Sequence, residues 1–250
     1  MDSIASAWQT QPYRGMFSYT RTHQAELLLR VAHSALLDCV FDRLEHLTAG
    51  RRFEKAVDVA CATGDWSRRC LQLADRVHGI DINPEFVRVA QERSEGNPRL
   101  SFAVEDMRDF DGFQGADLVF FAACLSCVDE AELRELLQRC VTQMKPGGII
   151  YVRVTVVHPQ REPHRGPIGH YRRKSFYDEL FASFGLRTLS SEESNTLVAA
   201  ELGRVALRIP RGGWGEQVMR TVARAGVEAS SLRGKRHRFH NWILQLPRWT

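Results

Sequence analysis

The spacing of apolar residues along the chain predicts first a long helix and then a series of strands. Between Thr22 and Leu47 apolar side chains recur every three or four positions, as on one face of an amphipathic helix, and Gly50 ends the segment. Residues 1–21 show no clear period, but they contain four aromatic side chains among polar ones: Trp8, Tyr13, Phe17 and Tyr19. We therefore expect a helix over residues 22–47, preceded by a segment that closes over a site as a lid.

After residue 50 the helical spacing gives way to short apolar runs separated by helical stretches. The first run is followed by a turn at Thr63-Gly64 and a helix, and the same order recurs along the chain. The runs that we interpret as strands cover residues 56–60, 77–82, 100–104, 116–122 and 149–157. Alternating strands and helices pair their strands in parallel through right-handed crossovers. The pattern therefore predicts an α/β fold.

The last third of the chain is harder to interpret. Residues 176–184 have helical spacing, and residues 186–190 and 205–209 fit a late antiparallel pair at the sheet edge. The hydrophobic ending over residues 242–249 fits either an interface or a docking segment.

The composition is that of an ordinary globular protein. The 250 residues are 44% apolar and 26% charged, which favours a single domain. No run approaches the ~18 apolar residues of a spanning helix, and the first residues lack the layout of a signal peptide. We therefore expect a cytoplasmic protein that does not enter a membrane. The six scattered cysteines are expected to be reduced and mostly buried.

Basic charge is concentrated near the end of the chain. Residues 211–250 carry eight Arg and Lys against two Glu, so this part contributes +6 to the net charge of +4. The remainder is slightly acidic, which argues against a nucleic-acid binder that acts through its overall field. We expect a lid over residues 1–21, a main domain over 22–210, and a basic extension over 211–250 that packs on the same domain.

The segment Val57–Ser67, V-D-V-A-C-A-T-G-D-W-S, carries the main chemical signal. Small residues between a strand and a helix let the backbone pass close under a ligand, and the helix N-terminus offers free N–H groups. This segment resembles motif I of the class I S-adenosylmethionine-dependent methyltransferases, which implies that Asp58 lies near the cofactor's ammonium. The chain departs from that motif because alanines occupy positions 60 and 62, where glycines are common, and only Gly64 remains.

Three later segments extend the resemblance. Asp81 ends the second strand, 17 residues after Gly64, where a carboxylate accepts hydrogen bonds from ribose hydroxyls. Asp106 and Met107 follow the third strand, where the family contacts adenine. Residues 115–121 and 137–150 resemble the family's fourth-strand motif and its turn before the fifth strand. Asp81 and Asp106 could instead cap a helix and a turn, whereas Asp117, at the opposite end of its strand, is expected to be a surface or turn residue.

The resemblance implies a Rossmann-like, doubly wound, mostly parallel seven-stranded sheet with helices on both faces, and S-adenosylmethionine as the cofactor. The implied cofactor-binding residues are Asp58, Ala60, Cys61, Ala62, Gly64, Asp81, Ile82, Asp106, Met107, Ala122 and Tyr19. Cys124 and Cys127 have the spacing of a redox or zinc pair, but no second pair accompanies them, so we interpret them as core or pocket lining and expect no metal.

In methyl transfer the protein aligns the reactants and, where needed, supplies a general base. The long polar segment after the fifth strand, residues 158–171, is where the family contacts substrate. His158, His170 and Tyr171 are the candidate catalytic residues, and a solvated loop with incidental histidines is the competing interpretation. Tyr13, Phe17, His158 and Tyr171 are the candidate substrate-binding residues.

We hypothesise transfer of a methyl group to nitrogen or oxygen of a small molecule, a secondary metabolite, by a monomer or homodimer. Three alternatives remain open: a peptide or protein N-terminal methyltransferase, a cofactor-binding protein without catalysis, and an RNA-binding or RNA-modifying protein. The last would use the basic residues 233–240 with Trp242, since interleaved aromatics can stack on bases. A charge run is usually a solvated surface, so nucleic acid is not the expected partner.

Overall fold

The structure, a computed structural model, describes residues 3–12, 23–166, 169–194, 221 and 237–248. These residues belong to two compact units. The first unit contains the described parts of residues 1–11, 50–192 and 236–250, and the second those of residues 12–49 and 193–235. In the second unit α2 (His23–Leu47) is the helix predicted from the apolar spacing, and the turn that follows it contains Ala49 and Gly50, both with positive φ.

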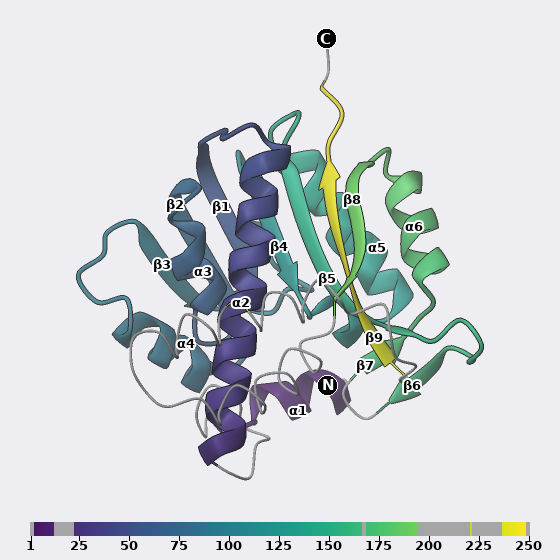
Figure 1. Ribbon diagram of the computed structural model, residues 1–250, viewed down its shortest axis with the longest axis horizontal. Coiled ribbons are helices and arrows are strands. Elements are labelled where there is room, and N and C mark those ends of the chain that lie inside the picture. Colours follow the sequence, from purple (N-terminus) through teal and green to yellow (C-terminus); the bar gives the residue numbers. More distant parts are fainter. Residues whose placement is uncertain (1–2, 13–22, 167–168, 195–220, 222–236, 249–250) are drawn as a thin grey trace. The chain divides into compact units, whose positions relative to one another are not determined.

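The first unit contains the sheet (Figure 1). Its helices are α1 (Ser3–Gln9), α3 (Asp65–Cys70), α4 (Pro84–Glu92), the short 3₁₀ helix η1 (Leu125–Cys127), α5 (Glu130–Gln143) and α6 (Lys174–Ser183). Its strands are β1 (Phe53–Val59), β2 (Ala74–Asp81), β3 (Leu100–Val104), β4 (Leu118–Ala122), β5 (Ile149–Val157), β6 (His164–Gly166), β7 (Gly169–Tyr171), β8 (Arg187–Ser194) and β9 (His237–Gln245).

Seven strands form one sheet in the order β3-β2-β1-β4-β5-β9-β8. The first five are parallel to their neighbours, and β9 runs antiparallel to β5. The chain adds β2 and then β3 on one side of β1, crosses back, and adds β4 and then β5 on the other side. The predicted doubly wound, mostly parallel α/β sheet is therefore confirmed.

Side chains alternate between the two faces of the sheet, and both faces are buried. On one face Val57, Val119 and Val152 belong to a core that also contains buried residues of α5 and α6. On the other face the Trp66 ring of α3 stacks on Tyr151, with ring centroids 5.2 Å apart. Burial on both sides explains why these strands are nearly continuous apolar runs in the sequence.

The late elements differ from the prediction in one respect. β8 covers the first strand of the predicted pair, whereas its predicted partner, residues 205–209, lies outside the described residues. Residues 237–245 instead form β9, which lies between β5 and β8. Trp242 and Leu244 of β9 are completely buried in the core with Tyr177 and Phe181 of α6. The interpretation of this hydrophobic ending as an interface or docking segment was wrong, because its apolar side chains complete the sheet.

Candidate functional site

The loops that follow β1, β2 and β4 meet where the strand order reverses. Val59, at the end of β1, is aligned with Ile80 of β2 on one side and with Phe121 of β4 on the other. Open α/β sheets bind ligands outside the carboxyl ends of their strands at this switch point. The sequence motifs identified above therefore lie at the edge where a ligand site is expected.

The loop after β1 takes up left-handed backbone conformations at alternate residues. Ala60, Ala62 and Gly64 have φ values of 57°, 48° and 74°. An L-residue other than glycine pays roughly 1–2 kcal/mol for this conformation, which explains physically why glycines are common at these positions in the family. The loop keeps the glycine-type backbone despite its alanines. At Gly64 the limit is steric, since a Cβ there would lie 2.9 Å from the Phe102 ring.

Asp58 is a buried carboxyl directly below this loop, with 1% of its surface exposed. Its Oδ2 accepts a hydrogen bond of 2.5 Å from the Ser67 hydroxyl, whereas its Oδ1 has no hydrogen-bond partner among the residues that the structure describes. Burial raises the pKa of Asp58 to about 7, against the opposing effect of the Ser67 hydrogen bond. A buried carboxyl oxygen without a partner is costly, so this position is suited to a ligand that donates hydrogen bonds or carries positive charge.

Asp81, at the end of β2, holds the neighbouring loops together. Its Oδ2 accepts a hydrogen bond of 2.8 Å from the Ala62 N–H, and its Oδ1 accepts one of 2.9 Å from the Asn83 N–H. Burial raises the pKa of Asp81, and the two backbone hydrogen bonds oppose that shift. Each oxygen still has a second lone pair, so this carboxyl can accept further hydrogen bonds.

Asn83 is a site residue that the sequence analysis missed. The cap of α4 is Asn83 rather than Asp81, because the Asn83 side chain accepts hydrogen bonds from the N–H groups of Glu85 and Phe86. The alternative interpretation of Asp81 as a helix cap was therefore wrong. The local signal was present in the sequence, since asparagine followed by Pro84 and Glu85 is typical of a helix start.

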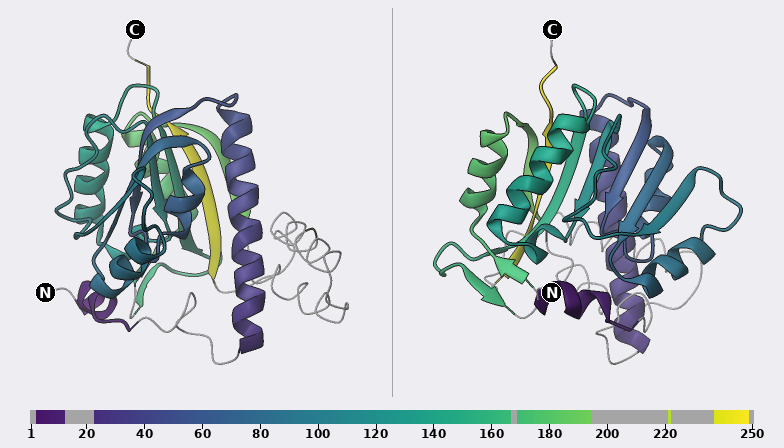
Figure 2. Two further views of the ribbon diagram at one scale, coloured as in Figure 1. Left: turned by 90° about the vertical axis from the view of Figure 1, so that its left-hand side faces the viewer. Right: turned by 180° about the vertical axis from the view of Figure 1, so that it is seen from behind.

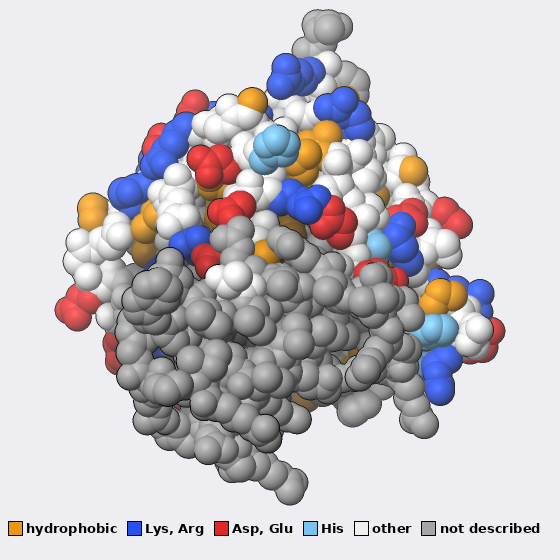
Figure 3. Space-filling model, viewed as in Figure 1, with side chains coloured by type: hydrophobic (Ala, Val, Ile, Leu, Met, Phe, Trp, Pro, Cys, Tyr) orange, Lys and Arg blue, Asp and Glu red, His pale blue; other side chains and the backbone are white. Residues whose placement is uncertain are grey.

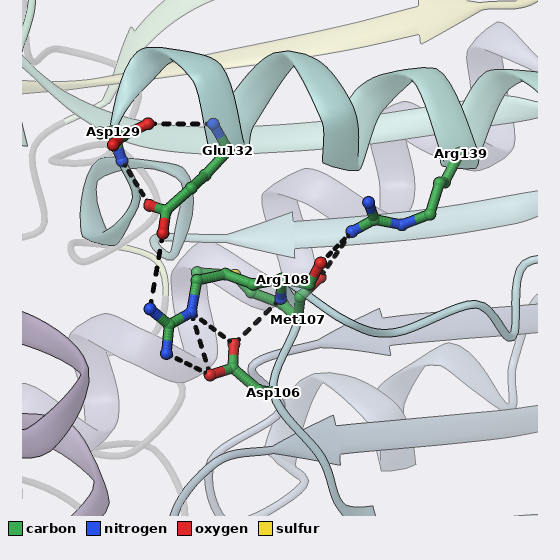
Figure 4. A network of polar contacts seen from close by, with 6 residues as sticks. All are labelled: Asp106, Met107, Arg108, Asp129, Glu132 and Arg139. Carbon is green, nitrogen blue, oxygen red and sulfur yellow. Dashed lines mark hydrogen bonds and ion pairs between the residues drawn. The ribbon is translucent and has the colours of Figure 1, made fainter. Parts of the chain in front are cut away.

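Asp106 follows β3 and lies in a network of charged side chains that extends to α5 (Figure 4). The Arg108 guanidinium donates to both oxygens of Asp106, at 2.5–3.1 Å, and also to Glu132 of α5 at 3.4 Å. Burial tends to raise the pKa of Asp106, but hydrogen bonds from Arg108 outweigh it and lower the pKa. Asp106 also accepts the backbone N–H of Arg108, so it stabilises the turn as well, as the alternative interpretation expected. Arg139 completes the network by donating to the Met107 and Arg108 carbonyls.

The described part of the N-terminal segment lies at the same edge of the sheet (Figure 2). The Asn83 Nδ2 donates hydrogen bonds of 2.9 and 2.8 Å to the carbonyls of Trp8 and Gln11. Ile4 is 1% exposed. The remaining residues that were expected to form the lid and contact ligands, Tyr13, Phe17 and Tyr19, lie outside the described residues.

The other residues of the predicted cofactor set also lie at these strand ends. Cys61 is buried, and its N–H donates to the Ile80 carbonyl. Ile82 directly follows β2, and Ala122 is the last residue of β4. Met107 is partly buried against the core. The structure thus brings all of the described members of the predicted set to one edge of the sheet.

The segment after β5 forms a two-stranded hairpin, β6 and β7, next to η1. Buried Arg172 anchors it by donating to the carbonyls of Leu125 and Val128, at 3.3 and 2.7 Å. His170 and Tyr171 belong to β7, and the Tyr171 ring lies 5.2 Å from the His164 ring. His158 directly follows β5, and its Nδ1 accepts a weak hydrogen bond of 3.3 Å from the Gln160 N–H.

Of the two cysteines of the C-x-x-C sequence, Cys124 precedes η1 and Cys127 is its last residue, and neither is in a disulfide. Burial raises the pKa of both, for Cys127 to about 11. Within the described ranges no three His, Cys, Asp or Glu side chains come together in a way that could hold a metal. In the same part of the chain, no helix is long and apolar enough to cross a membrane.

Two of the aromatic residues considered for stacking on RNA bases are buried in the structure, and Phe239 is half-buried. Trp242 is fully buried, His240 is 3% exposed, and the Arg153 guanidinium lies 4.1 Å from the centre of the Phe239 ring. On the face seen in Figure 3, basic and acidic side chains of the described residues are interspersed. Trp242 and His240 are therefore not available to stack on bases, and residues 233–236 lie outside the described part.

Comparison with known proteins agrees with this geometry. Residues 56–148 match the family described as "Methyltransferase domain". The malonyl-[acyl-carrier protein] O-methyltransferase 1 of Ilyobacter polytropus is 29% identical over 92 residues, which are 36% of this chain and 34% of that protein. The matched stretches span 40%, 34% and 42% of the length of the first three curated relatives.

Two solved structures show the same fold. The N-methyltransferase NodS from Bradyrhizobium japonicum, in complex with S-adenosyl-L-homocysteine, has a TM-score of 0.55 and 14% identity, covering 99% of this chain and 100% of that one. The [4+2]-cyclase SpnF has a TM-score of 0.61 and 18% identity, covering 85% and 81%. Residues 56–148 of this chain are therefore similar to the methyltransferase domain family, and the sheet that contains them has the fold of these two structures.

Proposed function

We propose that this chain transfers a methyl group from S-adenosylmethionine to nitrogen or oxygen of a small molecule, a secondary metabolite. The observation that carries this proposal is the buried carboxyl of Asp58, whose Oδ1 has no partner among the described residues, below a loop held in the glycine-type conformation. Methyltransferases of both acceptor types are among the similar proteins, an O-methyltransferase and an N-methyltransferase.

The site residues fit the cofactor in charge and hydrogen-bonding character. Asp58 would face the ammonium group, and the spare lone pairs of Asp81 would accept the ribose hydroxyls. Asp106 would accept the adenine amino group while it shares its oxygens with Arg108. Cys61, Ile82, Met107 and Ala122 would line the site between these polar contacts.

The cofactor supplies a methyl group already activated on a sulfonium, so the protein's own residues need only align the acceptor, exclude water and remove a proton. The hairpin of β6 and β7 carries two candidates for that last step, His170 and Tyr171. At His158 the Nδ1 lone pair is used by the Gln160 N–H, so a base there would first have to release this hydrogen bond. Substitution of His158 by Gln, His170 by Gln and Tyr171 by Phe separates the three.

A peptide α-amino group is the second candidate acceptor, because the order of segments after β4 is similar to that of methyltransferases that modify peptides. The third possibility, binding without catalysis, was suggested by the alanines in the loop. It is weakened by their left-handed conformations, which preserve the backbone that glycines would give. The cytoplasmic location and the monomeric or dimeric state stay predictions.

A calorimetric titration tests the proposal at its base. S-adenosylmethionine and S-adenosylhomocysteine are titrated into the wild-type chain, into Asp81→Ala and into Asp75→Ala. Asp75 lies on the same strand, but its side chain is 56% exposed and pairs with Arg52. We expect binding to the wild type and the Asp75 variant and its loss in the Asp81 variant. The absence of binding to the wild type would refute the proposal. Once binding is established, small amines, phenols and peptides are added with S-adenosylmethionine in turn. The class of compound that leads to formation of S-adenosylhomocysteine identifies the acceptor.

A further inference from the structure

Asn83 is a buried residue whose side-chain amide is fully used. It is 1% exposed, its Oδ1 accepts the two N–H groups that begin α4, and its Nδ2 donates to two carbonyls of the N-terminal segment. The orientation of the amide follows from these partners, because only an oxygen can accept from N–H groups and only the NH₂ can donate to carbonyls. One side chain thus caps the start of a helix and holds a separate segment of the chain.

The same residue is bonded to the carboxyl proposed to bind ribose. The Asn83 N–H donates to Asp81 Oδ1, and Asp81 Oδ2 accepts from the Ala62 N–H. A continuous series of hydrogen bonds therefore runs from the Trp8 and Gln11 carbonyls, through Asn83 and Asp81, to the loop after β1.

A second contact holds the N-terminal segment on the other side of the switch point. The Trp8 side chain hydrogen-bonds the thiol of Cys127, which belongs to η1 after β4. The segment formed by residues 3–11 is therefore held both at the end of β2 and beyond the end of β4 (Figure 2). These two ends flank β1 in the sheet, so the end of β1 and the loop that follows it lie between them.

We propose that Asn83 is a positioning residue that latches residues 3–11 over the carboxyl edge of the sheet, and that its two donated hydrogen bonds control how fast the cofactor enters and leaves. The proposal rests on the proposed cofactor site. Asn83 acts through the segment it holds, and its own side-chain groups are used up by protein partners, so it need not touch the cofactor.

Two substitutions break the latch and keep the helix cap. Asn83→Asp retains an oxygen for the N–H groups of α4 but replaces the donating NH₂ with an oxygen that faces two carbonyls. Asn83→Ser also caps helices, without adding a charge near Asp81. The matched control is Asn97→Asp, because the Asn97 side chain accepts a backbone N–H in the turn after α4.

The measurement is the association and dissociation rate of S-adenosylhomocysteine by stopped flow, together with hydrogen exchange of residues 3–11. Loss of two buried hydrogen bonds should raise both rates, on the order of tenfold, with a smaller change in Kd and faster exchange in residues 3–11. The Asn97 variant should match the wild type. A merely structural defect would raise the dissociation rate alone.

Three outcomes decide the question. A rise in both rates in both Asn83 variants supports the latch. Unchanged rates, or a rise in dissociation without a rise in association, overturn the latch while cofactor binding to the wild type stands. Failure of the wild type to bind the ligand at all overturns the proposed function, and the latch with it.

Discussion

Substitution of Ala62 by glycine probes the strain in the loop after β1. Ala62 has φ 48°, a region that destabilises an L-residue by roughly 1–2 kcal/mol but not glycine. Glycine in turn loses about 0.5–1 kcal/mol more than alanine in backbone entropy on folding. The difference leaves an expected gain of about 0.5–1 kcal/mol in the free energy of unfolding for Ala62→Gly.

Ala49 provides a matched control for this substitution. It has φ 51°, almost the same as Ala62, but it lies at the end of α2 in the other unit. Ala49→Gly should therefore give a similar gain in stability. Only Ala62→Gly removes a methyl group from the loop that passes under the proposed cofactor, so only this variant should also bind S-adenosylhomocysteine more tightly.

Urea denaturation and calorimetric titration, on the wild type and both variants, check the two parts. If Ala62→Gly lowers the free energy of unfolding, the strain argument is refuted. If Ala49→Gly raises the affinity as much as Ala62→Gly does, the gain in affinity has nothing to do with the loop, and the assignment of the loop to the cofactor fails.

Two further predictions concern charged side chains. The pKa of Asp58, about 7, lies above its ordinary value. Between these two pKa values the folded chain holds a proton that the unfolded chain has lost. The free energy of unfolding should therefore fall as the pH rises from about 4 to 7, by up to ~1.4 kcal/mol per pH unit. Asp58→Asn should abolish that slope in urea melts at pH 5 and pH 7, and an unchanged slope would assign it to other groups. Arg108→Gln should lower the free energy of unfolding by about 1 kcal/mol, because it breaks the partly buried hydrogen bonds to Asp106. Arg134→Gln, at an exposed ion pair on α5, should change it by close to nothing in the same melts. Equal losses of stability in the two variants would contradict the role given to the network.

The central part of the sheet could be predicted from the sequence for a physical reason. Strands buried on both faces must be apolar at nearly every position, so β4 and β5 are visible as nearly continuous apolar runs. The carboxylates of Asp58 and Asp81 could be placed as well, because parallel strands bring their carboxyl ends to one edge. The local spacing of residues and the fold class were enough to place these two carboxylates at the carboxyl edge of the sheet.

The features that the sequence analysis missed depend on partners far away in the chain. β9 reads H-R-F-H-N-W-I-L-Q, a basic stretch with interleaved aromatics, and only its pairing with β5 shows that it is an interior strand. Asn83 is recognisable as a helix cap, but its hydrogen bonds to the carbonyls of Trp8 and Gln11 link residues more than 70 positions apart. Spacing along the chain carries no information about such contacts.

The position of β9 has a consequence for how the protein is made. Among the described strands, β8 is joined to the sheet through β9 alone, and residues 237–245 come after every other strand in the sequence. Until the ribosome has added residues 237–245, the edge of β5 that later pairs with β9 has no neighbouring strand. Long, unpaired apolar edges of this kind promote pairing with other chains. Completion of the sheet thus waits for one late segment, and a chain released before it is finished should aggregate instead of folding into a smaller version of the domain.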